Sequence, residues 1–66
     1  MKITVNGEER LAPDGWSVAK LVADVGAPAQ GTAVAVNGDV VIRREWAHRP
    51  LRDGDRVEVL TAVQGG

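Results

Sequence analysis

Two Asn-Gly pairs restrict the folds open to this 66-residue chain more than any other feature. Asn6-Gly7 and Asn37-Gly38 each follow a short stretch rich in β-branched or apolar residues. Asn-Gly is the preferred loop of a two-residue hairpin, because a type I′ turn needs positive φ at both central positions. The sequence therefore predicts two antiparallel hairpins, one at the start of the chain and one beyond its middle.

The first hairpin has an alternating pattern in the strand before its turn. Met1, Ile3 and Val5 share one face and the residues between them share the other, as in a half-buried strand. A second strand is expected at residues 8–11, where the chain returns beside the first strand. The Ala-Pro-Asp-Gly sequence of residues 12–15 is typical of a turn and ends this strand.

Three further strands are expected in the second half of the chain. The second hairpin pairs residues 32–36 with residues 39–42, and an Arg-Asp-Gly-Asp turn at 52–55 precedes a last strand at 56–63. Residues 43–50 show no clear period and are expected to form an irregular or single-turn segment. The last strand alternates between two faces, the first with Val57, Val59, Thr61 and Val63 and the second with Glu58, Leu60 and Ala62.

One amphipathic helix is predicted between the hairpins. Ser17 is a suitable N-cap, since its hydroxyl can accept a hydrogen bond from a free amide of the first turn. Gly26 suits the left-handed position after the helix, and Pro28 prevents its continuation. Between these signals apolar residues recur with helical spacing, at Val18, Leu21, Val22 and Val25. A helix of about eight residues is marginal alone, so it must be held by packing on a sheet.

The order strand-strand-helix-strand-strand-strand predicts an α+β fold with one helix packed across one face of a mixed sheet. A chain this short buries only about 60% of its unfolded surface, so we expect one domain with a thin core. Trp46 is expected to cover an edge of that core, and Trp16 to pack beside the helix start. The opposite face of the sheet must face solvent or a partner.

Composition and charge exclude several classes of function. The absence of cysteine excludes disulfides, a thiolate nucleophile and a Cys-based zinc site, and His48 is the only histidine. A net charge of −1 argues against binding to nucleic acid or a membrane surface. We expect no secretory signal or membrane span, and hence a cytoplasmic protein. The arginines within residues 43–56 are interpreted either as solvated loop residues or as a rim that steers an acidic partner.

The chain stops at Gln64-Gly65-Gly66, directly after the last predicted strand. We therefore expect a folded domain at 1–63 and a flexible tail at 64–66. Glycine has no Cβ, so an extended Gly-Gly end can pass through a narrow channel while the domain stays outside. The terminal carboxylate becomes an acyl donor once it attacks the α-phosphate of ATP to give an acyl-adenylate. A sulfur nucleophile then displaces the phosphate group and leaves a thiocarboxylate on Gly66.

Four segments carry a resemblance to a known family: Val34-Ala35-Val36-Asn37-Gly38, Arg43-Arg44-Glu45-Trp46, the Leu-Arg-Asp-Gly-Asp-Arg-Val-Glu-Val-Leu of residues 51–60, and Val63-Gln64-Gly65-Gly66. Together they resemble the ThiS family, sulfur carriers of thiamin thiazole biosynthesis within the ubiquitin-like β-grasp superfamily. The resemblance covers the whole chain. One departure is Ile42, where members of the family commonly have proline before the arginine.

The resemblance implies a β-grasp fold and a protein cosubstrate that is not itself an enzyme. It implies that a ubiquitin-activating-enzyme-like adenylyltransferase adenylates Gly66, that a sulfur donor system thiocarboxylates it, and that thiazole synthase uses the sulfur. ATP and Mg²⁺ serve the activating enzyme, and the chain is expected to bind no cofactor or metal itself. Gln64 and Gly65 are expected to thread into partner active sites. Partner docking is expected on the outward side of the last strand, at Glu58, Leu60 and Ala62.

Three other functions stay open on the sequence. A sulfur carrier for molybdopterin synthesis or another pathway uses the same terminal chemistry. A ubiquitin-like modifier is joined through its terminal glycine to lysines of other proteins. In a plain interaction module the two glycines have no chemical role.

Overall fold

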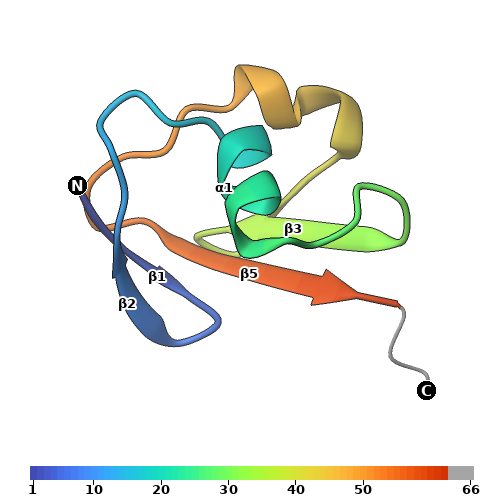
Figure 1. The fold of residues 1–66 in the computed structure, drawn as a ribbon, viewed down its shortest axis with the longest axis horizontal. Coiled ribbons are helices and arrows are strands. Elements are labelled where there is room, and N and C mark those ends of the chain that lie inside the picture. Colours follow the sequence, from blue (N-terminus) through green and yellow to red (C-terminus); the bar gives the residue numbers. More distant parts are fainter. Residues whose placement is uncertain (63–66) are drawn as a thin grey trace.

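The computed structural model of the chain describes residues 1–62. Its strands form one sheet in the order β2-β1-β5-β3-β4, and helix α1 lies across one face of it (Figure 1). This arrangement confirms the predicted α+β class, the order of the elements and the single helix on a mixed sheet. The elements are β1 (Lys2–Val5), β2 (Glu8–Leu11), α1 (Val18–Val25), β3 (Thr32–Val36), β4 (Asp39–Val41), the 3₁₀ helix η1 (Arg43–His48) and β5 (Arg56–Thr61).

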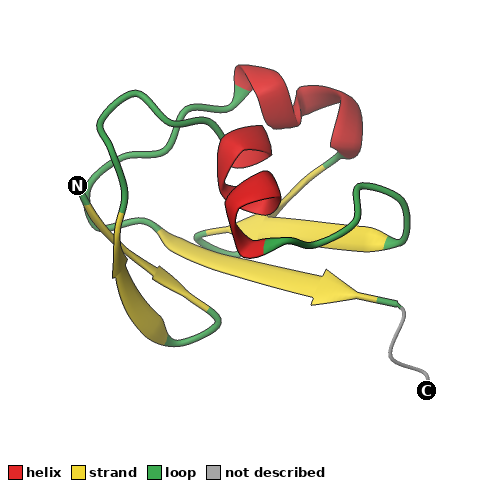
Figure 2. Ribbon diagram, viewed as in Figure 1, coloured by secondary structure: helices red, strands yellow, loops and turns green. Residues whose placement is uncertain are grey.

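The last strand occupies the centre of the sheet. β5 runs parallel to β1 on one side and antiparallel to β3 on the other. Each neighbour belongs to one of the two antiparallel hairpins, β1 with β2 and β3 with β4. Figure 2 shows α1 and η1 on the same side of this sheet. The C-terminal strand therefore joins two hairpins that do not otherwise pair with each other.

Both predicted hairpin turns have the backbone conformation that Asn-Gly favours. Asn6 and Gly7 have φ values of 52° and 85°, and Asn37 and Gly38 have φ values of 53° and 87°. Asparagine and glycine adopt this left-handed region at a lower cost than other residues do. The turn type is thus a local consequence of the two dipeptides.

The predicted helix signals are also confirmed. The Ser17 hydroxyl accepts a hydrogen bond from the amide of Lys20 at 3.3 Å, and Gly26 after the helix has a φ of 79°. The helix buries the apolar face that its spacing predicted, with Val25 only partly covered. The core beneath it comes from the inward side of the sheet and from α1, η1 and two loops: Ile3, Val5, Ala12, Val18, Leu21, Val22, Val34, Val36, Val41, Trp46, Leu51, Val57 and Val59.

Two predicted strand ends and the predicted structure of one segment were wrong in the second half of the chain. β4 ends at Val41, because Ile42 is the residue that leads into η1. Residues 43–48 form a regular 3₁₀ helix, where an irregular or single-turn segment was predicted. The buried Trp46 explains why these residues are helical, since its indole N–H donates to the Val41 carbonyl at 2.8 Å and holds the segment against β4. β5 ends at Thr61, and residue 63 of the predicted strand lies outside the described residues.

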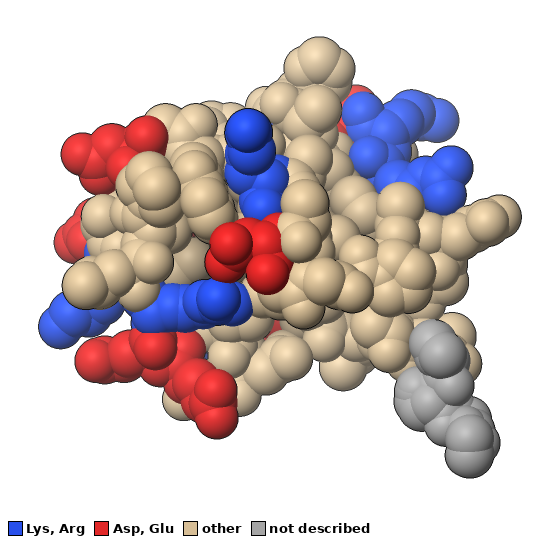
Figure 3. Space-filling model, in the orientation of Figure 1, with Lys and Arg blue, Asp and Glu red and all other residues tan. Residues whose placement is uncertain are grey.

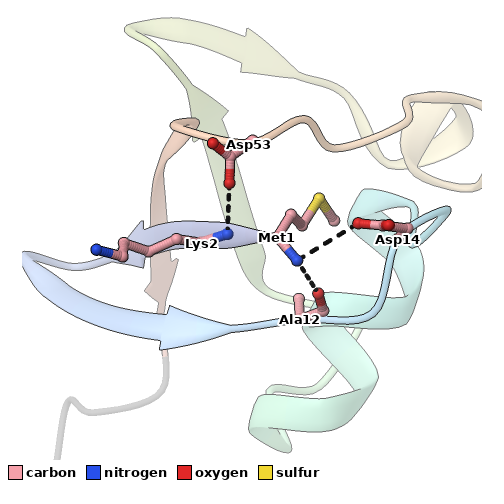
Figure 4. A network of polar contacts seen from close by, with 5 residues as sticks. All are labelled: Met1, Lys2, Ala12, Asp14 and Asp53. Carbon is pink, nitrogen blue, oxygen red and sulfur yellow. Dashed lines mark hydrogen bonds and ion pairs between the residues drawn. The ribbon is translucent and has the colours of Figure 1, made fainter.

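The start of β1 is tied to two loops at one end of the sheet (Figure 4). The Met1 ammonium donates to the Ala12 carbonyl at 2.7 Å and lies 3.4 Å from the Asp14 carboxylate. The backbone N–H of Lys2 donates to the Asp53 carboxylate at 2.7 Å. The Met1 contacts hold the turn after β2, and the Lys2–Asp53 hydrogen bond holds the turn that precedes β5 against β1.

Candidate functional site

The described part of the chain ends one residue beyond β5. Beyond Thr61, the amide of Ala62 donates to the Gly31 carbonyl at 2.7 Å, which continues the β3–β5 pairing by one residue. Gln64, Gly65 and Gly66, the predicted tail residues, lie outside the described part of the chain. The last described residue is therefore held against the residue that precedes β3, where the β3–β5 pairing ends.

Asn6 secures the middle of β5. Its carboxamide donates to the Val59 carbonyl at 3.1 Å and accepts from the Val59 amide at 2.9 Å. β1 itself pairs with β5 only through Thr4 and Val5. The Asn6 side chain thus takes the place of a peptide group and extends the parallel pairing past the end of β1.

Asn37 secures the start of β5. Its carboxamide donates to the Asp55 carboxylate at 3.0 Å and accepts from the Arg56 amide at 2.9 Å. Asp55 is the only charged side chain in the buried class among residues 1–62, at 7% exposed. Its second carboxylate oxygen accepts from the Arg52 amide at 2.8 Å, so both oxygens of this carboxylate have partners.

The outward face of the sheet carries an apolar patch beside the exit of the chain. Leu60 is 67% exposed and lies opposite Ala33 of β3. In the next row Ala35 lies between Glu58 of β5 and Val40 of β4, and Val40 is 74% exposed. We call this the apolar patch; its members are Ala33, Ala35, Val40 and Leu60.

The structure brings two of the three predicted docking residues onto one face. Glu58 and Leu60 both lie on the outward face of β5 and alternate with the buried Val57 and Val59, as predicted. Ala62 is exposed but follows the end of the strand. The patch residues on β3 and β4 were missed, although Val40 stands out in the sequence as an apolar residue next to the core residue Val41. Their place beside Leu60 follows from the strand order, which alternation alone does not reveal.

Charges are distributed unevenly over the surface. In Figure 3 basic side chains gather at one end, near η1, whereas acidic and basic side chains are mixed over the opposite part of the molecule, around the first hairpin. His48 is exposed at the end of η1. Within residues 1–62 no three side chains of the metal-binding types come together, and no helix is both long and apolar enough to cross a membrane.

The mixed sheet with one crossing helix and a central C-terminal strand defines a β-grasp protein. The family model of the ThiS family matches residues 2–66, which is nearly the whole chain. The chain therefore belongs to the ThiS family.

Individual relatives agree with this assignment. The chain is 38% identical over 64 residues to the sulfur carrier protein ThiS of Thermus thermophilus, covering 97% of this chain and 98% of that one. It is 29% identical to the sulfur carrier protein ThiS of Escherichia coli, and the match covers both chains completely. It is also 32% identical to part of a thiazole synthase of Paramagnetospirillum magneticum, where it covers 20% of that longer chain.

The fold is likewise that of solved members of the family. The crystal structure of the thiamine biosynthesis protein ThiS from Geobacter metallireducens superimposes with a TM-score of 0.84 at 32% identity. That match covers both chains completely. A solution structure of a thiamine biosynthesis protein from the same organism gives a TM-score of 0.83. The β-grasp prediction is thus confirmed.

Proposed function

We propose that this chain is a sulfur carrier of thiamin biosynthesis whose C-terminal Gly66 is adenylated and then thiocarboxylated. The observation that carries the proposal is the end-to-end match to sulfur carrier proteins of the ThiS family. In this chain the central strand β5 is followed in the sequence, four residues later, by Gly65-Gly66. In this proposal the chain is a protein cosubstrate and the catalytic groups belong to its partners.

The proposed chemistry uses one atom group of this chain, the terminal carboxylate. A carboxylate oxygen of Gly66 attacks the α-phosphate of ATP and pyrophosphate leaves, with ATP and Mg²⁺ held by the activating enzyme. A sulfur nucleophile then attacks the carbonyl carbon of the acyl-adenylate, and AMP leaves. The resulting thiocarboxylate delivers its sulfur in the formation of the thiazole ring.

The proposed role of the domain is to hold β5, the strand that precedes the reacting C-terminus, in a fixed position. β5 is held at its start by Asn37 and in its middle by Asn6, so the exit of the chain has a defined place on the body. We propose that residues 1–63 form the domain and that Gln64 and Gly65 enter the partner's active site ahead of Gly66. Two glycines suit this role because they add no side chain to a narrow channel.

We propose that the partners dock on the apolar patch together with Glu58 and Ala62. Exposed apolar side chains that gather on one face of a small domain commonly mark an interaction surface. The patch includes Leu60, two residues before the exit of the chain. A partner seated there reaches the tail and the domain at the same time.

Two enzymes are the proposed partners, both in the cytoplasm. The first is a ubiquitin-activating-enzyme-like adenylyltransferase, which a terminal carboxylate needs to become an acyl donor; a sulfur donor system follows it. The second is thiazole synthase. Support for it comes from the thiazole synthase relative in which a segment similar to this chain forms a fifth of the polypeptide.

The proposal is tested by intact-mass spectrometry of the chain after incubation with the adenylyltransferase, ATP·Mg²⁺ and a sulfide source. The wild-type chain should gain the mass of one oxygen exchanged for sulfur, located at Gly66. Gly66→Ala, and a chain extended by one residue after Gly66, should fold normally and gain nothing, because the reacting carboxylate is crowded or displaced. Unchanged sulfur loading of both variants contradicts the proposal.

Docking on the apolar patch is tested by Leu60→Lys. We expect this variant to raise the apparent KM of the adenylyltransferase for the carrier by about ten-fold or more, because a lysine replaces an apolar contact beside the exit. Leu11→Lys is the matched control, since Leu11 is 82% exposed and lies on β2 at the far side of the sheet. Equal effects of the two substitutions contradict docking at the patch.

A further inference from the structure

A groove opens on the helix side of the sheet, between the first hairpin and the end of β5. It has a volume of about 960 Å³. Pockets for small ligands reach this size, but they are lined mainly by apolar and aromatic side chains. This groove has mostly polar walls and no aromatic residue: its lining is Val5, Asn6, Glu8, Glu9, Arg10, Val25, Gly26, Ala27, Pro28, Val59 and Thr61. The lining suits a protein segment better than a small molecule.

The edge of β5 is open where it borders the groove. The carbonyls of Val57 and Val59 point toward β1, where they accept from the backbone and the side chain of Asn6. Thr61 follows two residues later, so its N–H and C=O point the same way. β1 ends before that level, and within residues 1–62 no group forms a hydrogen bond with the Thr61 backbone on this side. An unpaired strand edge of this kind can accept another strand.

Within residues 1–62 the hairpin side of the groove carries one unpaired carboxylate, because Glu9 of the lining forms an ion pair with Lys2 at 3.9 Å. Glu8 is exposed and forms no ion pair with any other residue of the described chain. Arg10, the basic residue of the lining, is neutralised by Asp24 of α1 at 3.0 Å. Figure 3 shows acidic side chains over this hairpin with basic side chains between them. An entering segment that carries lysine or arginine meets a charge of the opposite sign.

We propose that the groove receives an extended basic segment of the enzyme that activates the tail, and that this segment pairs with the edge of β5 at Thr61. The inference rests on the proposed function. Addition of a strand to an open sheet edge gives affinity through main-chain hydrogen bonds, and side-chain contacts give specificity. Here the main-chain groups belong to Thr61 and the specificity comes from Glu8. The enzyme segment would contact β5 at its last residue, on the helix side of the sheet. The apolar patch lies on the opposite face.

Thr61→Pro tests the strand pairing directly. Proline removes an N–H that has no partner within residues 1–62, and its ring occupies the space of an incoming strand. We expect this variant to raise the apparent KM of the adenylyltransferase for the carrier by about ten-fold in ATP–pyrophosphate exchange. Thr61→Val separates the side chain from the backbone; because it retains the N–H, it should raise this KM much less than Thr61→Pro does, and equal effects of the two variants contradict pairing through the backbone. Far-ultraviolet circular dichroism and urea unfolding establish that both variants are folded.

Glu8→Lys tests the charge without altering the backbone of β5. We expect it to raise the same KM by about ten-fold at low salt, with a smaller effect at high salt, because the charges are exposed. Asp39→Lys is the control: it changes the net charge equally from an exposed site on β4, at the other edge of the sheet. It should have no more than about a two-fold effect.

The possible outcomes separate this inference from the proposed function. If both Thr61→Pro and Glu8→Lys give a normal KM in ATP–pyrophosphate exchange, the proposed binding of the enzyme in the groove is wrong. The proposed sulfur carrier function is then unaffected. An effect confined to binding of thiazole synthase overturns the assignment of the groove to the activating enzyme. If an active adenylyltransferase does not activate the wild-type chain, the proposed function fails and the inference falls with it.

Discussion

The two Asn-Gly turns have nearly the same backbone conformation but hold β5 in different ways. In each, the asparagine side chain forms two hydrogen bonds to groups at or next to the central strand. Asn37 contacts the buried Asp55 carboxylate and the first amide of β5. Asn6 contacts both backbone groups of Val59, midway along the strand. The first contact anchors the base of β5, whereas the second replaces a missing part of β1.

This difference shows how one dipeptide acquires two roles. The positive φ angles come from local preference and are the same in both turns. The partners of the carboxamides come from the strands that the rest of the chain places beside each turn. Because Asn6 ends the parallel pairing at Val59, the edge of β5 at Thr61 is left open beside the groove.

The largest effect is expected from Asn37→Asp. The new carboxylate oxygen faces the Asp55 carboxylate where the amide now donates at 3.0 Å, so a hydrogen bond becomes a repulsion between like charges in a partly buried place. We expect a loss of about 3 kcal/mol or more in the free energy of unfolding. Urea unfolding at neutral pH measures it.

Asn6→Asp is the matched control for that variant. Its new oxygen faces the neutral carbonyl of Val59, so it loses one hydrogen bond without opposing a full charge. The expected loss is about 1–2 kcal/mol. Equal losses in the two variants contradict the distinct roles of the two turns.

Replacement of each asparagine by glycine separates the carboxamide from the turn conformation. Glycine retains the positive φ, and its greater freedom in the unfolded chain is common to both variants, so the difference between the two losses reports the side-chain hydrogen bonds. We expect about 2 kcal/mol for Asn37→Gly, because one bond goes to a charged group, and about 1 kcal/mol for Asn6→Gly. Thermal or urea unfolding of both variants in one buffer gives the comparison. A larger loss for Asn6→Gly reverses the predicted order.

The smallest effect concerns local opening of β5. In Asn6→Gly the Val59 amide loses its acceptor, so its hydrogen exchange should become faster by more than the global loss of stability explains. The Arg56 amide bonds to Asn37 and is the internal control, because its exchange should follow global stability alone. Equal acceleration of both amides shows that Asn6 supports only the fold as a whole.

The parts of the fold that depend on neighbouring residues were predictable. The two turns, the limits of α1 and the limits of β2 agree with the sequence signals that predicted them. The boundaries that failed are those at Ile42 and after Thr61. Both lie where a tertiary contact decides the end of a strand: the Trp46 indole on the Val41 carbonyl in the first case, and the length of β3 in the second.

The candidate site was predictable only in part. Alternation along the last strand correctly placed Glu58 and Leu60 on one face. The terminal glycines and the family segments pointed to the chemistry of the tail without any structure. The rest of the apolar patch was not predictable from the sequence. Val40 and Leu60 share a face because β3 lies between their strands, in the order β5-β3-β4.

By itself the sequence determined the hairpins, the helix and the class of fold, because turns, caps and periodicity depend on residues a few positions apart. The sulfur carrier family came from the resemblance of four sequence segments to known members. Only the tertiary structure decided that the last strand lies between the two hairpins. That order brings Asn6 to Val59, 53 residues away, and Asn37 to Arg56, 19 residues away. It also leaves the apolar patch on one face and the groove on the other. Contacts at such separations depend on where whole strands lie, which no local preference specifies.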